Sequence, residues 1–185
     1  GTLGPGDVQW MTAGSGVVHR EMPSARMKRE GGRMHGFQLW VNLPARLKMT
    51  TPRYQDVSSN QVPEISRENG VKIRIIAGEV DGIRGAVSEI YADPAYLDVS
   101  IPANGSFSHP VDKGHTIFAY VFEGRGIFGT GEETLEKSVS QPGLVVFGDG
   151  NYIQAGAADG PVRFLLVSGK PLNEPIARYG PFVMN

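Results

Sequence analysis

Two side chains near the start of the chain, His19 and Glu21, are separated by a single residue and could both bind a metal ion. Apolar residues and glycine turns precede them, and a strand is expected to begin near Val17. Side chains alternate between the two faces of a strand, so His19 and Glu21 would point to the same side. Imidazole suits iron, copper, nickel and zinc, and a carboxylate adds a charge-neutralising oxygen. The spacing therefore predicts half of a transition-metal site, with a surface ion pair as the alternative.

The composition excludes several classes of partner. The 185 residues carry 18 Lys and Arg against 19 Asp and Glu, a formal net charge of −1, so no overall basic surface for nucleic acid is present. The basic residues at 26–33 are interpreted as a solvated loop. No apolar run is long enough to span a bilayer, and the absence of cysteine excludes disulfides and thiolate sites. We expect a monomer without direct nucleic-acid or membrane partners, in the cytoplasm, or in the nucleus if the source is eukaryotic.

The elements that would position these side chains are short strands. Residues 37–43 suit a buried strand that ends at Pro44, and residues 45–71 have the polar, proline-containing composition of a linker between domains. From residue 72 onward, apolar runs recur between Gly, Pro, Asn and Asp, which predicts an all-β fold closed as a small antiparallel jelly-roll barrel. The expected strands are 72–78, 86–92, 96–101, 116–122, 126–131, 143–147 and 162–168.

Several separated motifs resemble the pirin family of bicupins. They are Pro5 to Met11, Gly14 to Glu21, Leu39 to Pro44, Glu174-Pro175 and Tyr179 to Asn185. The resemblance implies two tandem cupin barrels, the first of them incomplete in this chain. The domains would be 1–44, the end of the first barrel; 45–71, the linker; and 72–185, the second barrel with its tail. From this resemblance, we expect the chain to be an internal fragment that lacks the N-terminal part and the C-terminal helix of family members.

The same resemblance implies a metal site. Family members hold iron with three histidines and one glutamate, and two of those histidines lie upstream of the Pro5-Gly6 turn. His19 and Glu21 match the third histidine and the glutamate. The expected cofactor is Fe(II), with Cu, Ni, Co, Mn or Zn as alternatives and no metal at all as a further alternative for the fragment.

The implied function is a quercetinase-type dioxygenase that opens flavonol rings with O2. Glu21 would then act both as a metal ligand and as the catalytic base. One alternative is an iron-containing regulator that binds transcription factors without catalysis, and another is an inactive fragment with an incomplete metal site. The expected partner is therefore a flavonol-like small molecule or a regulatory protein.

The second barrel is not expected to bind metal in the manner of cupins. Its ligand positions would fall near residues 111, 113 and 117–118, and near 151–154, where the sequence offers neutral, apolar or lysine side chains. His109 and His115 flank these positions and are interpreted as loop histidines, and His35 as a cap or a hydrogen-bonded core histidine. We therefore expect the second barrel to be a scaffold and an interaction surface.

Overall fold

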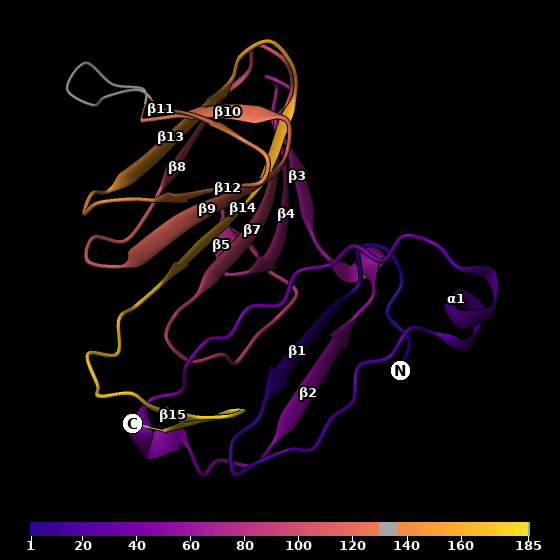
Figure 1. Cartoon of the computed structure of the whole chain (residues 1–185). Coiled ribbons are helices and arrows are strands. Elements are labelled where there is room, and N and C mark those ends of the chain that lie inside the picture. The colour runs from indigo at the N-terminus through magenta and orange to yellow at the C-terminus, as the bar shows by residue number, and fades with distance from the viewer. Residues whose placement is uncertain (130–136, 185) are drawn as a thin grey trace. The chain divides into compact units, whose positions relative to one another are not determined.

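A computed structural model describes residues 1–129 and 137–184 of the chain. The described residues form mostly strands, with one α-helix and two short 3-10 helices, which confirms the all-β class. The chain divides into two compact units, residues 1–59 with 173–185, here called unit 1, and residues 60–172, here called unit 2 (Figure 1). No helix among the described residues is long and apolar enough to cross a membrane.

Unit 2 consists of two main antiparallel sheets that enclose one core. The first has the strand order β12-β9-β14-β7-β4-β3 and the second β11-β10-β13-β8. The bounds of the first sheet are Glu64–Ser66 (β3), Lys72–Ala77 (β4), Ala95–Ile101 (β7), Thr116–Glu123 (β9), Gly143–Val146 (β12) and Val162–Gly169 (β14). Those of the second are Ser106–Pro110 (β8), Arg125–Phe128 (β10), Lys137–Ser140 (β11) and Tyr152–Ala157 (β13). A small hairpin joins Glu79–Val80 (β5) to Ile83–Arg84 (β6).

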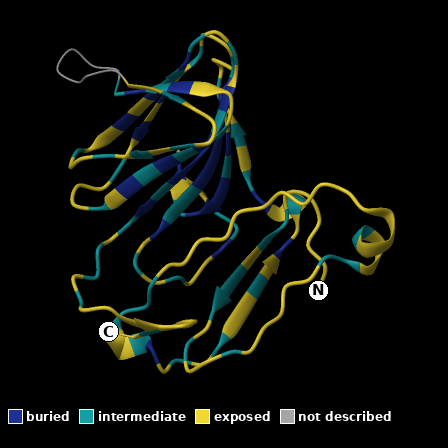
Figure 2. Cartoon of the chain, viewed as in Figure 1, coloured by how far each residue is buried: buried dark blue, intermediate teal, exposed yellow. Residues whose placement is uncertain are grey.

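The core of unit 2 follows from the alternation of apolar residues along these strands. On β9, Ile117, Ala119 and Val121 are buried, whereas the residues between them are half-buried. The rings of Phe107 and Phe128, from the second sheet, contact Phe164 of the first sheet edge-on, at centroid distances of 5.9 and 5.4 Å. Figure 2 shows that the buried residues lie mainly along these strands. Apolar faces from both sheets therefore meet in a single core.

Most of the strands expected in this region are present, and one expectation was wrong. β4, β7, β9, β12 and β14 coincide with predicted runs, and β10 occupies the start of the expected strand 126–131, whose last two residues lie outside the described part of the chain. Residues 86–92 form no strand. Glu89 and Ala92 have φ angles of 53° and 69° there, a left-handed conformation that cannot continue an extended strand. The strands of unit 2 that were not predicted are β3, β5, β6, β8, β11 and β13.

Unit 1 contains two small antiparallel sheets. Val8–Thr12 (β1) pairs with Arg53–Val57 (β2), and Ala177–Tyr179 (β15) pairs with Phe182–Met184 (β16). Its helices are Ala25–Glu30 (α1) and Ala45–Leu47 (η1), while Ser59–Gln61 (η2) lies at the boundary with unit 2. The strands expected from Val17 and over 37–43 are absent, which corrects those two predictions. A strand requires a hydrogen-bonded neighbour, and no described segment pairs with either stretch.

Residues 173–185 belong to unit 1 because specific contacts hold them there. The Glu174 carboxylate accepts a hydrogen bond of 2.7 Å from the backbone N–H of Ala45. The buried Lys48 ammonium donates to the Asn42 side chain and, at 3.0 Å, to the carbonyl of Val183. The expected linker, 45–71, thus spans the division between the units, with 45–59 in unit 1 and 60–71 in unit 2.

Candidate metal-binding residues

His19 and Glu21 lie on an irregular segment of unit 1 between a turn that is bonded to Thr50 and the capped start of α1. At its start, Ser15 donates a backbone hydrogen bond of 2.8 Å to the carbonyl of Thr50. At its end, the Ser24 hydroxyl caps α1 by accepting a 3.1 Å bond from the N–H of Met27. The sequence fits these turns, because Gly14 has a φ of +52° and a Cβ there would lie 2.1 Å from the Thr50 carbonyl oxygen.

The structure brings the two predicted ligands together. Nε2 of His19 lies 3.9 Å from Oε1 of Glu21, and their side chains are 39% and 66% exposed. This distance is within the range of an ion pair. It is also within the range for two ligands of one metal ion, because ligand atoms about 2.1 Å from an ion lie roughly 3 to 4 Å from one another. Among the described residues, no third His, Asp or Glu completes a cluster with them. The pair therefore fits two donors of a divalent-metal site.

The other histidines lie in three different environments. His35 is exposed and packs edge-on against Phe37, with a centroid distance of 5.2 Å. His109 was expected in a loop, but it lies on β8 and is buried, because β8 alternates and turns Phe107 and His109 inward. Its ring stacks on Phe107, and its Nδ1 has no hydrogen-bond partner within the described chain. Burial lowers the pKa of His109, the charge of Arg67 lowers it further, and Asp81 acts in the opposite direction.

His115 does lie in a loop, and two carboxylates accompany it there. Asp112, three residues earlier, and Asp93, from a separate segment, place their oxygens near its imidazole. Sequence reasoning missed both aspartates. The spacing of three residues between Asp112 and His115 could have indicated a pair of metal ligands. No residue next to Asp93 in the sequence indicates that it lies near that pair in the folded protein.

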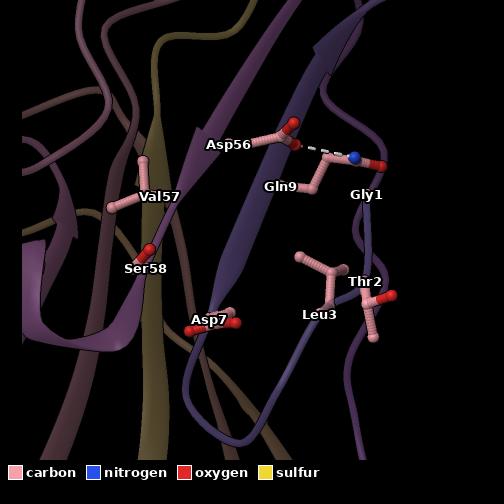
Figure 3. A pocket seen from close by; sticks show the side chains of 8 residues that line it. All are labelled: Gly1, Thr2, Leu3, Asp7, Gln9, Asp56, Val57 and Ser58. Atoms are coloured by element: carbon pink, nitrogen blue, oxygen red, sulfur yellow. Dashed lines mark hydrogen bonds between the residues drawn. The ribbon is translucent and has the colours of Figure 1, made fainter.

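Two pockets, one in each unit, are lined by residues other than His19 and Glu21. In unit 1, a pocket of about 90 Å³ lies beside β1 and β2, and the Gln9 amide donates a 2.8 Å hydrogen bond to Asp56 at its wall (Figure 3). This volume is below the roughly 300 Å³ at which small-molecule sites usually begin. In unit 2, an open groove of about 590 Å³ is lined by residues that include Lys72, Glu123 and Arg163.

The two facing antiparallel sheets of unit 2 are the arrangement of the cupin class of β-barrel proteins. Two sequence profiles agree with this class: that of the pirin family matches residues 1–41, and that of the pirin C-terminal cupin domain matches residues 96–185. The chain belongs to the pirin family.

Similar proteins share the whole length of this chain. A pirin-like protein of Caulobacter vibrioides is 39% identical over 100% of the chain and 63% of its own length. A Pseudomonas aeruginosa protein, named as a candidate quercetin 2,3-dioxygenase, is 40% identical over 100% of the chain and 64% of its own length. The crystal structure of a quercetin 2,3-dioxygenase from Acinetobacter baumannii superposes with a TM-score of 0.87 at 35% identity, covering 100% of this chain and 62% of that one. This chain thus spans under two thirds of the length of these relatives.

Proposed function

We propose that the protein containing this chain is a metal-dependent dioxygenase that acts on flavonol-like substrates, with His19 and Glu21 among its metal ligands. The observation that carries the proposal is the approach of the His19 imidazole to the Glu21 carboxylate, at 3.9 Å, on a segment that is tied to Thr50 at its start and leads into α1. Two similar proteins whose names refer to quercetin 2,3-dioxygenase support the substrate class.

The donor set indicates which metals would fit. One imidazole and one carboxylate, without a thiolate, suit divalent first-row ions, of which Fe(II) is the leading candidate and Cu, Ni, Co, Mn and Zn are the alternatives. A bound divalent ion supplies a Lewis acid that orients a flavonol and polarises its oxygens. Further donors would come from outside the described residues.

Glu21 has a second role in this proposal. Two thirds of its side chain is exposed, so one carboxylate oxygen can accept the hydroxyl proton of a substrate while the other faces His19. Such a base must come within about 2.6 to 3.2 Å of the proton donor, and proton transfer by a positioned side chain contributes about 10²- to 10⁴-fold to the rate. His19 would keep the carboxylate in place through the metal that they share.

The proposal is tested by substituting each residue in the protein at its natural length. We expect Glu21→Gln to lower quercetin turnover by at least about 100-fold, because the amide cannot accept the proton. His19→Gln should lower the metal content measured by elemental analysis. Glu30→Gln is the matched control, because Glu30 is an exposed glutamate on α1 that pairs with Arg26 at 2.8 Å. Turnover in Glu21→Gln within twofold of the unsubstituted protein would contradict the role of Glu21.

A regulatory function through protein contact is the second candidate. The exposed apolar side chains of Phe37, Leu39, Trp40 and Val41, between 38% and 61% exposed in this chain, favour it because such side chains are typical of interaction surfaces. The same experiment separates the two candidates. A protein that binds its metal through His19 and Glu21 but turns over no flavonol under aerobic conditions would favour the regulator.

A further inference from the structure

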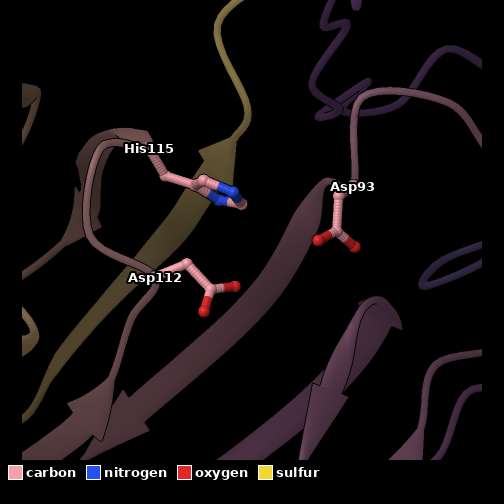
Figure 4. Close-up of side chains that lie close together, drawn as sticks. All are labelled: Asp93, Asp112 and His115. Carbon is pink, nitrogen blue, oxygen red and sulfur yellow. The ribbon is translucent and has the colours of Figure 1, made fainter.

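Three potential metal ligands converge in unit 2, away from the His19 and Glu21 pair in the sequence. Asp93 lies between β6 and β7, whereas Asp112 and His115 lie in the loop between β8 and β9. One ligand atom from each lies within 4.8 Å of the other two. Figure 4 shows the Asp112 and His115 side chains extending from one loop toward Asp93 on the other segment. Both aspartates are exposed, and His115 is half-buried.

Backbone hydrogen bonds hold both segments in place. Next to Asp93, the carbonyl of Ala92 accepts a 2.9 Å bond from Lys170, just beyond β14. Within the other loop, the N–H of Gly114 donates to the Asp149 carboxylate at 2.9 Å. The three ligands therefore project from backbone that is already tied to neighbouring strands and loops, which lowers the entropic cost of binding an ion.

The three side chains have no other partner in the described part of the chain. None of them forms a hydrogen bond or an ion pair with the rest of residues 1–129 and 137–184. Two carboxylates that approach each other in this way repel when both are ionised. No cationic side chain pairs with either Asp93 or Asp112 there to offset the repulsion. A bound cation would offset it.

We propose that Asp93, Asp112 and His115 form a second divalent-cation site, selective for ions between Mn²⁺ and Zn²⁺ in the first transition row. Two carboxylates and a neutral imidazole balance a charge of +2. The nitrogen donor disfavours Mg²⁺ and Ca²⁺, which take oxygen ligands, and the absence of sulfur disfavours Cu⁺. Ligand atoms around such an ion lie roughly 3 to 4 Å apart, which is somewhat closer than the 4.8 Å within which these three lie. Small rotations of the exposed Asp93 and Asp112 side chains would close this difference, and water would fill the remaining coordination positions.

The ion would connect two segments that are separate in the sequence, the one before β7 and the loop between β8 and β9. Because binding to the folded state alone stabilises a protein, Zn²⁺ should raise the unfolding temperature of unit 2. This site does not depend on the proposed dioxygenase function, since it shares no residue with the His19 and Glu21 pair.

The test uses the protein at its natural length with His19→Gln and Glu21→Gln in place, so that the unit 1 pair no longer binds. Zn²⁺ is added, and its stoichiometry and affinity are measured by equilibrium dialysis with elemental analysis. We expect this protein to bind one Zn²⁺ per chain, and to bind it at least about tenfold more weakly after Asp112→Asn or His115→Gln. Asp159→Asn is the matched control, because Asp159 is exposed in the same unit but pairs with Arg125 instead. Circular dichroism confirms that each variant folds.

A second measurement locates the ion directly. Substoichiometric Mn²⁺ should broaden the backbone amide resonances of Asp93 and Gly114 before those of β10. Zn²⁺ affinity that is equal in the Asp112→Asn, His115→Gln and Asp159→Asn proteins would overturn the proposal. So would the absence of Zn²⁺ binding in the parent protein, or Mn²⁺ broadening that begins elsewhere in unit 2.

Discussion

The ion pair between Asp98 and Arg163 allows a quantitative test of what stabilises unit 2. Asp98 lies on β7, and its side chain is only 10% exposed. Arg163, on β14, donates from Nε and Nη2 to the two carboxylate oxygens, at 2.8 and 2.6 Å. These hydrogen bonds raise the pKa of the guanidinium. The pair is bidentate, and the carboxylate is far more enclosed than the cation, whose side chain is 35% exposed.

This asymmetry predicts unequal costs for removing the two partners. Arg163→Met leaves a buried carboxylate without its cation, a change that costs about 3 to 5 kcal/mol for fully buried pairs. Because Arg163 is one third exposed and water can reach the vacated position, we expect about 2 to 4 kcal/mol here. Asp98→Asn leaves a guanidinium that still contacts water and Glu123, so its cost should be about 1 to 2 kcal/mol. The double variant should cost less than the sum.

Hydrogen exchange is the suitable assay, because both tryptophans lie in unit 1 and their fluorescence does not report on unit 2. The slowest amides of β7 and β14, such as those of Leu97 and Leu166, report the free energy of opening of the barrel. Lys72→Met is the control, since Lys72 is an exposed lysine in the same sheet and should change stability by less than about 0.5 kcal/mol. If Arg163→Met cost no more than Asp98→Asn, the argument from burial would be refuted.

Two further predictions concern single residues of unit 2. Burial lowers the pKa of His109 in the folded state, so the unfolded chain binds a proton at a higher pH than the folded chain does. Unit 2 should therefore lose stability as the pH falls from about 6.5 to the lowered pKa of His109 in the folded state. His109→Leu should remove this part of the pH dependence in urea unfolding, and His115→Gln should keep it; an unchanged slope in His109→Leu would contradict the assignment. Gly124 has a φ of +75°, and a Cβ there would lie 2.1 Å from the Pro161 carbonyl oxygen, so Gly124→Ala should destabilise unit 2 by about 2 kcal/mol or more. Gly160→Ala, at a position with open space, should be nearly neutral by thermal unfolding, and equal unfolding temperatures for the two variants would refute the steric argument.

The strands that were predicted correctly are those whose own residues have the composition typical of a strand. β4, β7, β9 and β14 are rich in β-branched and aromatic residues and are bounded by turn residues, so local composition was sufficient. β8 was missed because its Ser106-Phe107-Ser108-His109-Pro110 sequence resembles a loop. Its extended conformation comes from pairing with β13, which no local pattern reveals.

The sequence by itself determined the family, through motifs spread over the whole chain, and it indicated that His19 and Glu21 lie close together. The side chains of residues two apart lie on the same side of most extended backbones, so His19 and Glu21 lie close together although the expected strand is absent. Only the tertiary structure decided that His109 is buried, that residues 173–185 join unit 1, and that Asp93 meets Asp112 and His115. Each of these outcomes depends on which distant segments pair, and that is set by burial and strand pairing over the whole fold.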